Sequence, residues 1–246
     1  MQLFPGWSLV AGGGMTDEYD CNCYLWEFAP DEFALFDAGA GRNVAALMQR
    51  VEEAGGTAQQ IRYLFLTHHH ADHVGGAAEL RERTGAQVVA SHHTGEIVRQ
   101  ADEERMGLRA AREAGGYPAT YRVQPCPIDI IVEDGAFFEL GGQQLQILAT
   151  PGHCAGALSF LVHWQGQRGL IAGDVIFPGG RISLLNLPDC SLSDYSTTIA
   201  RLAELKIDFL LPGHLEAQLH DASASILFAQ SQFQRLLIPA CYYHPA

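Results

Sequence analysis

Apolar residues occur along the chain in short blocks of two kinds, continuous runs and runs with helical spacing. The continuous runs at 24–28 and 33–36 are separated by Ala-Pro-Asp-Glu, which predicts a β-hairpin. Residues 44–54 carry apolar side chains three or four positions apart, and Gly55-Gly56 follows, so an amphipathic helix is expected there. The run at 61–66, apolar apart from Arg62, predicts a strand buried on both faces.

The alternation continues beyond residue 76, with one interruption. A helix at 77–83 and a strand at 87–90 precede a charged, then Gly/Pro-rich segment at 91–127, interpreted as a helical insertion. Further strands are predicted at 128–132, 137–140, 143–149, 157–162, 169–171 and 209–211. Helices are predicted at 193–205, with Ser193 as N-cap, and at 221–237. This order predicts an α/β fold of two sheets covered by helices, as a single domain over residues 1–246.

Charge narrows the choice of partners. The chain has 28 acidic and 15 basic side chains, a formal net charge of −13, which disfavours nucleic acid and anionic membranes as partners. No apolar run approaches the ~18 residues of a membrane span. The first residues resemble no signal peptide, and the six cysteines are scattered, as in a protein of a reducing compartment. A cytoplasmic protein acting on a small molecule is expected, with a homodimer as the default assembly.

Histidine is the unusual residue of this composition. Four of the eleven histidines fall within the segment Thr67-His-His-His-Ala-Asp-His73, directly after the predicted strand at 61–66. His68 and His70 are two residues apart, so in extended backbone their rings point the same way. Asp72 and His73 follow where the chain turns towards a helix, and they can reach a second metal ion. His69 points to the other side and is expected to be structural.

Three more segments place a metal-binding side chain after an apolar strand and beside glycine. They contribute His153 in Pro-Gly-His, Asp174 in Gly-Asp and His214 in a second Pro-Gly-His. Four segments with one layout indicate a metal site rather than a chance histidine cluster. Nitrogen and carboxylate ligands without thiolate suit zinc, and also iron or manganese. The remaining histidines are expected to be structural or exposed, at positions 92, 93, 163, 220 and 244.

The order of these motifs resembles the metallo-β-lactamase-fold hydrolase superfamily, and most of all its glyoxalase II-like (hydroxyacylglutathione hydrolase-like) branch. The resemblance runs from Asn22 to His214 and includes an early Asp-x-Gly turn at Asp37. It implies an αββα sandwich, with the insertion around 91–127 and a site for two divalent metal ions at one edge. By resemblance, the ligands are His68, His70 and His153 for metal 1, Asp72, His73 and His214 for metal 2, and Asp174 for both.

The activity implied is a dinuclear metal-dependent hydrolase of a small-molecule ester, thioester, lactone or amide-type bond. A metal-bridging hydroxide would be the nucleophile, and Asp72 the catalytic residue that orients it or protonates the leaving group. Two alternatives stay open, a mononuclear iron enzyme like the persulfide dioxygenases and a slow-turnover acyl-ligand sensor. Arg235 is the only Lys or Arg after His214, which disfavours a glutathione thioester. Arg181, seven residues after Asp174, is a candidate contact for a substrate carboxylate or a partner in a surface salt bridge.

Overall fold

The computed structural model describes residues 1–242 and divides the chain into two compact units, Met1–Val132 and Glu133–Ala246. The expectation for His244 lies outside the described residues. The prediction of a single domain over the whole chain stays a prediction, and each unit is considered by itself below.

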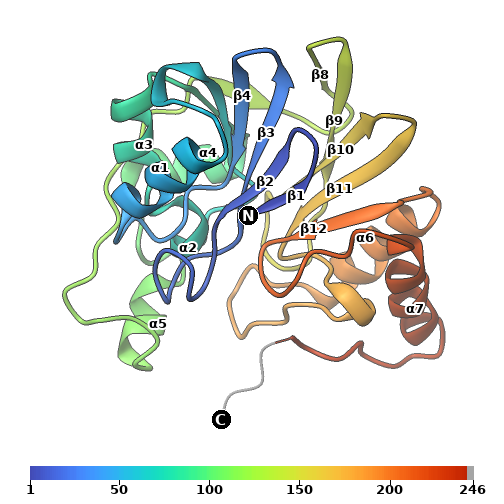
Figure 1. Ribbon diagram of the computed structural model, residues 1–246. Coiled ribbons are helices and arrows are strands. Elements are labelled where there is room, and N and C mark those ends of the chain that lie inside the picture. Colours follow the sequence, from blue (N-terminus) through green and yellow to red (C-terminus); the bar gives the residue numbers. More distant parts are fainter. Residues whose placement is uncertain (243–246) are drawn as a thin grey trace. The chain divides into compact units, whose positions relative to one another are not determined.

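Unit 1 contains a mixed sheet whose strands follow the order of the sequence. Its first four strands are labelled in Figure 1. Its seven strands are β1 Gln2–Phe4, β2 Trp7–Ala11, β3 Cys23–Ala29, β4 Glu32–Phe36, β5 Ile61–Phe65, β6 Gln87–Ser91 and β7 Ile130–Val132. Neighbours from β1 to β4 are antiparallel, whereas β4 to β7 run parallel to one another. Parallel strands place their carboxyl ends at one edge, so the segments following β4 and β5 are neighbours.

Helices cover one face of this sheet. The helices of unit 1 are α1 Val44–Glu53, α2 Ala71–Val74, α3 Ala77–Thr84, α4 His92–Gln100 and α5 Leu108–Glu113, with the short 3-10 helix η1 Ala58–Gln60 before β5. Apolar side chains of α1, α3 and α4 share one buried cluster with those of the strands, including Leu47, Leu80 and Leu64. The 3.6-residue spacing seen at 44–54 is the helix face that this cluster buries.

Unit 2 contains a second sheet of five strands, in the order β12-β11-β10-β9-β8. They are β8 Phe137–Leu140, β9 Gln143–Ala149, β10 Leu158–Trp164, β11 Gln167–Gly173 and β12 Phe209–Pro212. Neighbours are antiparallel except for β11 and β12, which run parallel. Helices α6 Leu192–Ala203 and α7 Ala222–Gln234 pack on this sheet, and η2 Pro178–Gly180 is a 3-10 turn.

The α/β class and the two helix-covered sheets are confirmed, and β8 and β9 begin and end where they were predicted. The segment 91–127 contains two helices, α4 and α5, as expected of a helical insertion. The N-cap of α6 was wrong by two residues, because Ser191 rather than Ser193 accepts the hydrogen bond from the Asp194 N–H. In the described residues, no helix is long and apolar enough to cross a membrane.

Candidate metal centre

The predicted metal ligands lie at the carboxyl ends of strands in both units. In unit 1, Thr67 to His73 follows β5, and His70 is the N-terminal cap residue of α2. In unit 2, His153 follows β9, Asp174 follows β11 and His214 follows β12. Strands β9, β11 and β12 all run in the same direction. Strand β10 is antiparallel to both β9 and β11, and β12 is parallel to β11. Each unit therefore gathers its ligands at one edge of its sheet.

The four predicted ligands of unit 1 lie close together. His68 Nε2 is 3.1 Å from His70 Nδ1, and His73 Nε2 is 3.6 Å from the Asp72 carboxylate. The ring centroids of His68 and His73 are 4.0 Å apart. His68, His70 and His73 are buried, while the Asp72 side chain keeps 19% of its surface exposed. The histidines are thus held inside the protein, and the carboxylate faces partly outward.

Asp37 fixes the orientation of two of these histidines. Its carboxylate accepts hydrogen bonds from the Thr67 N–H, the Thr67 hydroxyl and His73 Nδ1, each at 2.8 Å. Because the Thr67 hydroxyl donates its proton to Asp37, its oxygen can accept one from His68 Nδ1 at 2.9 Å. Protons on the two Nδ1 atoms leave Nε2 of His68 and His73 deprotonated, the state in which imidazole binds a metal ion.

In unit 2, the two predicted histidine ligands both lie close to one carboxylate oxygen of the third ligand, Asp174. Asp174 Oδ2 lies 3.6 Å from His153 Nε2 and 3.5 Å from His214 Nε2. His153 Nδ1 donates to the Ser183 carbonyl at 2.8 Å, so its Nε2 is also the deprotonated nitrogen. Asp174 and His153 are buried, and the His214 side chain is 21% exposed.

Tyr195 of α6 joins the loops that carry these ligands. Its hydroxyl lies 2.8 Å from the Ser183 carbonyl and 3.1 Å from the Asp174 carbonyl, and it accepts a bond from the Ser183 N–H at 3.2 Å. Burial raises the pKa of this phenol well above its usual value, so it remains a donor. Gly152 has φ +145°, and a Cβ there would lie 2.7 Å from the Tyr195 ring, so glycine lets the His153 loop approach α6.

The donor atoms fit a divalent metal ion. With metal–nitrogen distances of about 2.0–2.1 Å and tetrahedral angles, two ligand atoms lie about 3.3 Å apart. The distance of 3.1 Å in the His68–His70 pair, and those of 3.5–3.6 Å around Asp174, fall near this value. Imidazole and carboxylate are ligands that zinc, iron and manganese accept.

The structural role expected of His69 stays a prediction, since His69, His93 and Asp189 lie close enough together to hold a metal ion as well. His69 is fully buried, and its ring lies 5.5 Å from that of His93. The six cysteines carry no disulfide, and four of them are buried. Burial raises the pKa of both Cys21 and Cys23, which favours the neutral thiol at these two positions.

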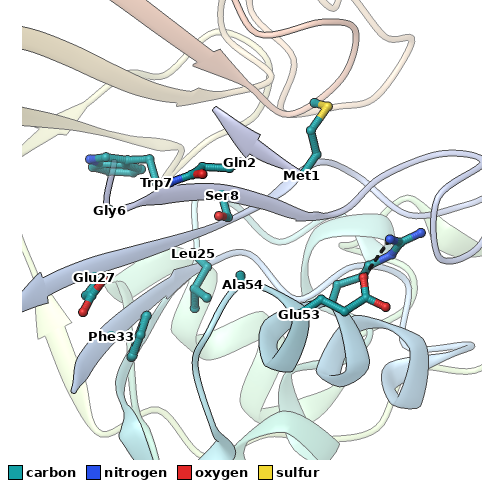
Figure 2. Close-up of a pocket in the computed structure, with 11 residues that line it drawn as sticks. Met1, Gln2, Gly6, Trp7, Ser8, Leu25, Glu27, Phe33, Glu53 and Ala54 are labelled. Carbon is teal, nitrogen blue, oxygen red and sulfur yellow. Dashed lines mark hydrogen bonds and ion pairs between the residues drawn. The ribbon is translucent and has the colours of Figure 1, made fainter. Parts of the chain in front are cut away.

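A cavity of about 340 Å³ lies elsewhere in unit 1 (Figure 2). It is lined by residues of β1 to β4 and of the last turns of α1, among them Ser8, Leu25 and the Arg50–Glu53 ion pair. Phe33 lies at the start of β4, at the opposite end of that strand from Asp37. No predicted ligand contributes to the lining among the described residues, so this cavity is separate from the metal ligands of unit 1.

Sequence reasoning missed the residues that orient the ligands. Thr67, Ser183 and Tyr195 act here through a hydroxyl or a backbone carbonyl, and such residue types occur everywhere in a sequence. Asp37 had a signal, since it opens an Asp-x-Gly turn directly after an apolar strand. Its φ of +60° is a left-handed conformation that aspartate tolerates better than most residues.

Comparison with known proteins identifies the family. The family model described as "Metallo-beta-lactamase superfamily" matches residues 16–214, a range that includes all seven predicted ligands. The human protein named acyl-coenzyme A thioesterase MBLAC2 is 31% identical in an alignment of 182 positions that covers 69% of this chain and 62% of that protein. Hydroxyacylglutathione hydrolase GloC of Haemophilus influenzae is 28% identical over 181 residues, 74% of this chain and 76% of that one.

A solved structure shows the same fold. The metallo-beta-lactamase of Cronobacter sakazakii with a HARLDQ motif superposes with a TM-score of 0.74 at 22% identity, covering 96% of each chain. The chain spans less than two thirds of the length of several curated relatives that it matches, including the human protein. The resemblance stated from the motifs is confirmed, and the relatives are named as hydrolases, the enzyme class predicted here. The chain belongs to the metallo-beta-lactamase superfamily.

Proposed function

We propose that this chain is a dinuclear metal-dependent hydrolase of a small-molecule thioester or related ester, lactone or amide-type bond. The observation that carries the proposal is the shared orientation of the histidines. His68, His73 and His153 each have Nδ1 within hydrogen-bond distance of a protein oxygen, and each has Nε2 close to another predicted ligand. Side chains held in this way are prepared to bind metal rather than to satisfy one another.

The ligand assignment follows the motif order of the family. We assign His68, His70 and His153 to one metal ion, Asp72, His73 and His214 to the other, and Asp174 to both. The support is that the family match covers all seven positions and that each holds a competent ligand. Two bound divalent ions supply Lewis acidity and lower the pKa of water towards neutrality.

Side chains and backbone groups of the protein orient the metal ligands and the attacking water. Asp37 and Ser183 hold the imidazole tautomers, and Tyr195 holds the Asp174 and Ser183 loops. Asp72 is the proposed catalytic residue, because its partly exposed carboxylate can orient the attacking water, or take up a proton from that water and give it to the leaving group.

Thioesters head the substrate classes because the two curated relatives described above are named as a thioesterase and a hydroxyacylglutathione hydrolase. The six free thiols fit a reducing compartment, so a cytoplasmic location is part of the proposal, as is a homodimer. An iron dioxygenase and an acyl-ligand sensor are the competing functions.

The test is an assay of zinc-loaded protein on thioesters, lactones, phosphodiesters and β-lactams, with metal content measured in parallel. The expected result is two zinc ions per chain and thioester turnover that Asp72→Ala abolishes while the fold is kept. Asp194→Ala, an exposed aspartate in the first turn of α6, is the control and keeps full activity. One bound iron with thiol-dependent oxygen uptake would contradict the proposal, as would ligand binding without turnover under any metal.

A further inference from the structure

The C-terminal segment that follows α7 returns to the metal ligands of unit 2. Residues 240–242, called the strap here, pair with the loop after Asp174. The Ile182 N–H donates to the Ala240 carbonyl at 3.0 Å, and the Tyr242 N–H donates to the Ile182 carbonyl at 2.9 Å. These two bonds form a short parallel bridge between Ile182 and Cys241. The next residue of the loop, Ser183, is the one whose carbonyl holds His153.

Tyr242 of the strap lies flat against a predicted ligand. Its ring centroid is 5.2 Å from that of His214, and the two planes differ by 11°, a stacked arrangement. Phe177 packs against the same tyrosine, with ring centroids 4.4 Å apart. Phe177 is completely buried, so it is a fixed surface on which the Tyr242 ring rests.

His214 depends on such a contact more than the other predicted histidine ligands do. His68, His70, His73 and His153 are between 0% and 6% exposed, whereas the His214 side chain is 21% exposed. Burial therefore restricts its ring less. A flat aromatic neighbour limits rotation of the imidazole about its last side-chain bond, which keeps Nε2 at its 3.5 Å distance from Asp174 Oδ2.

We propose that Tyr242 is a positioning residue that holds the imidazole of His214 in its metal-binding orientation, with the strap and Phe177 as its support. This inference rests on the proposed function, since it needs His214 to bind metal. Tyr242, which lies outside every sequence motif of the chain, would then be one of the residues that determine metal affinity. The aromatic ring, rather than the hydroxyl, performs this role.

The experiment measures release of zinc from the loaded full-length protein to a chromogenic chelator, for single variants and for a double variant. Tyr242→Ala is expected to release one of the two zinc ions about tenfold faster, the lower end for loss of a residue that orients a ligand. Tyr242→Phe keeps the ring and releases zinc at the wild-type rate. Leu236→Ala, at a neighbouring position that is 94% exposed, is the matched control and also leaves release unchanged.

The double variant separates positioning from a general loss of structure. His214→Ala releases the same ion quickly, and adding Tyr242→Ala to it is expected to change nothing further, because the two side chains act as a unit. Additive effects, or wild-type release by Tyr242→Ala, would overturn the inference alone. Wild-type protein that holds no zinc would overturn the proposed function and the inference with it. If Tyr242→Ala fails to fold, Tyr242→Leu supplies the same test with an apolar side chain of intermediate size.

Discussion

A single buried carboxylate, that of Asp37, holds two histidines in place, His73 by a direct hydrogen bond and His68 through the Thr67 hydroxyl. It accepts three hydrogen bonds, and all three donors come from the Thr67–His73 segment. Asparagine tolerates the left-handed backbone at this position as aspartate does, so the charge can be removed without disturbing the turn. The position thus allows the role of the carboxylate to be measured by itself.

Asp37→Asn is expected to weaken zinc binding by about 10–100-fold, because the amide cannot accept all three bonds and the His73 tautomer is lost. Competition with a chelator of known affinity measures the effect. Asp31→Asn is the control, since Asp31 also has a positive φ (61°) but is exposed and bonds only to Gln60 among the described contacts. Unchanged zinc affinity in Asp37→Asn would show that Asp37 does not orient the ligands.

Tyr195→Phe removes one buried hydroxyl that serves two loops. The Ser183 N–H loses its acceptor, and the Ser183 and Asp174 carbonyls lose the one O–H donor that lies between them, so the free energy of unfolding should fall by about 1–3 kcal/mol. The ring still fills the space beside Gly152, so the urea m-value should not change. Tyr19→Phe, at a partly exposed ring stacked on Tyr117, is the control. Equal losses in the two variants would contradict a special role for Tyr195.

At this scale the sequence predicts ligands but not the groups that orient them. His153 and Asp174 are recognisable because their side chains carry metal chemistry and follow apolar strands. Tyr195 is not recognisable, because its role arises from a contact with Ser183, twelve residues away, that only the packed helix creates. Tyr242 is still harder to predict, since its partner His214 lies before the whole of α7.

The bounds of a helix or strand were predicted well where the hydrophobic pattern alone determines them, and less well where a turn determines where the strand ends. Strands β8 and β9 match their predicted bounds. Strand β10 was predicted to end at residue 162 but continues to Trp164, and β11 was predicted to begin at residue 169 but begins at Gln167. The two residues between them both have positive φ, a tight hairpin turn that lets the pairing continue to the end. Strands β1 and β2 were missed for the same reason, because Pro5-Gly6 is a hairpin turn there and does not end the structure.

Helix α3 is tied to the sheet of unit 1 by an ion pair whose contribution depends on pH. Arg81 on α3 makes two bonds, of 2.9 and 3.2 Å, to Asp129, which also accepts from the Val88 N–H of β6. The Arg81 guanidinium lowers the pKa of Asp129 from its usual value of 3.8. A lowered pKa means that the pair stabilises the fold above about pH 4 and stops doing so as the pH falls through the lowered pKa.

Asp129→Asn should therefore reduce the free energy of unfolding near neutral pH by about 0.5–1 kcal/mol, a value kept small because Arg81 is 37% exposed. The difference from wild type should shrink as the pH falls through the lowered pKa of Asp129. Urea unfolding at several pH values provides the measurement. Glu79→Gln removes an i,i+4 pair with Arg83 on the same helix, where both partners are almost half exposed, and should have little effect. A loss that persists unchanged at low pH would rule out the ion pair as its cause.

At the scale of the whole molecule, the sequence predicted two helix-covered sheets because buried strands and amphipathic helices leave periodic patterns. It did not predict a substrate, because a loop near the predicted ligands, such as 177–183, has no such pattern. Bound metal is expected to be a global stabiliser, since any ligand that binds only the folded state shifts the unfolding equilibrium.

Zinc at about a hundredfold excess over its dissociation constant should raise the free energy of unfolding by about 2.7 kcal/mol for each zinc ion bound, and a chelator should reverse the gain. Differential scanning calorimetry of loaded and stripped protein measures the shift in melting temperature. Asp174→Asn, which weakens the carboxylate proposed to contact both ions, should show a smaller shift. A melting temperature independent of zinc and chelator would contradict specific metal binding.

The chain has almost twice as many acidic as basic side chains, so an arginine without an acidic partner is a candidate contact for a negatively charged substrate. Most arginines of unit 1 pair with a carboxylate, whereas Arg181 is exposed and has no acidic partner within the described residues. It lies on the loop between Asp174 and Ser183, whose backbone is fixed by the bond from the Phe177 N–H to the Arg181 carbonyl.

Arg181→Ala should therefore raise KM about tenfold for a thioester that carries a carboxylate, the loss of one hydrogen bond to a charged group, and leave kcat unchanged. A neutral thioester of similar size should show no change in KM. Arg235→Ala, an exposed arginine of the same unit beyond the end of α7, is the control and should behave as wild type with both substrates. Equal changes in KM for the charged and the neutral thioester would mean that Arg181 supports the loop and does not bind the substrate's carboxylate.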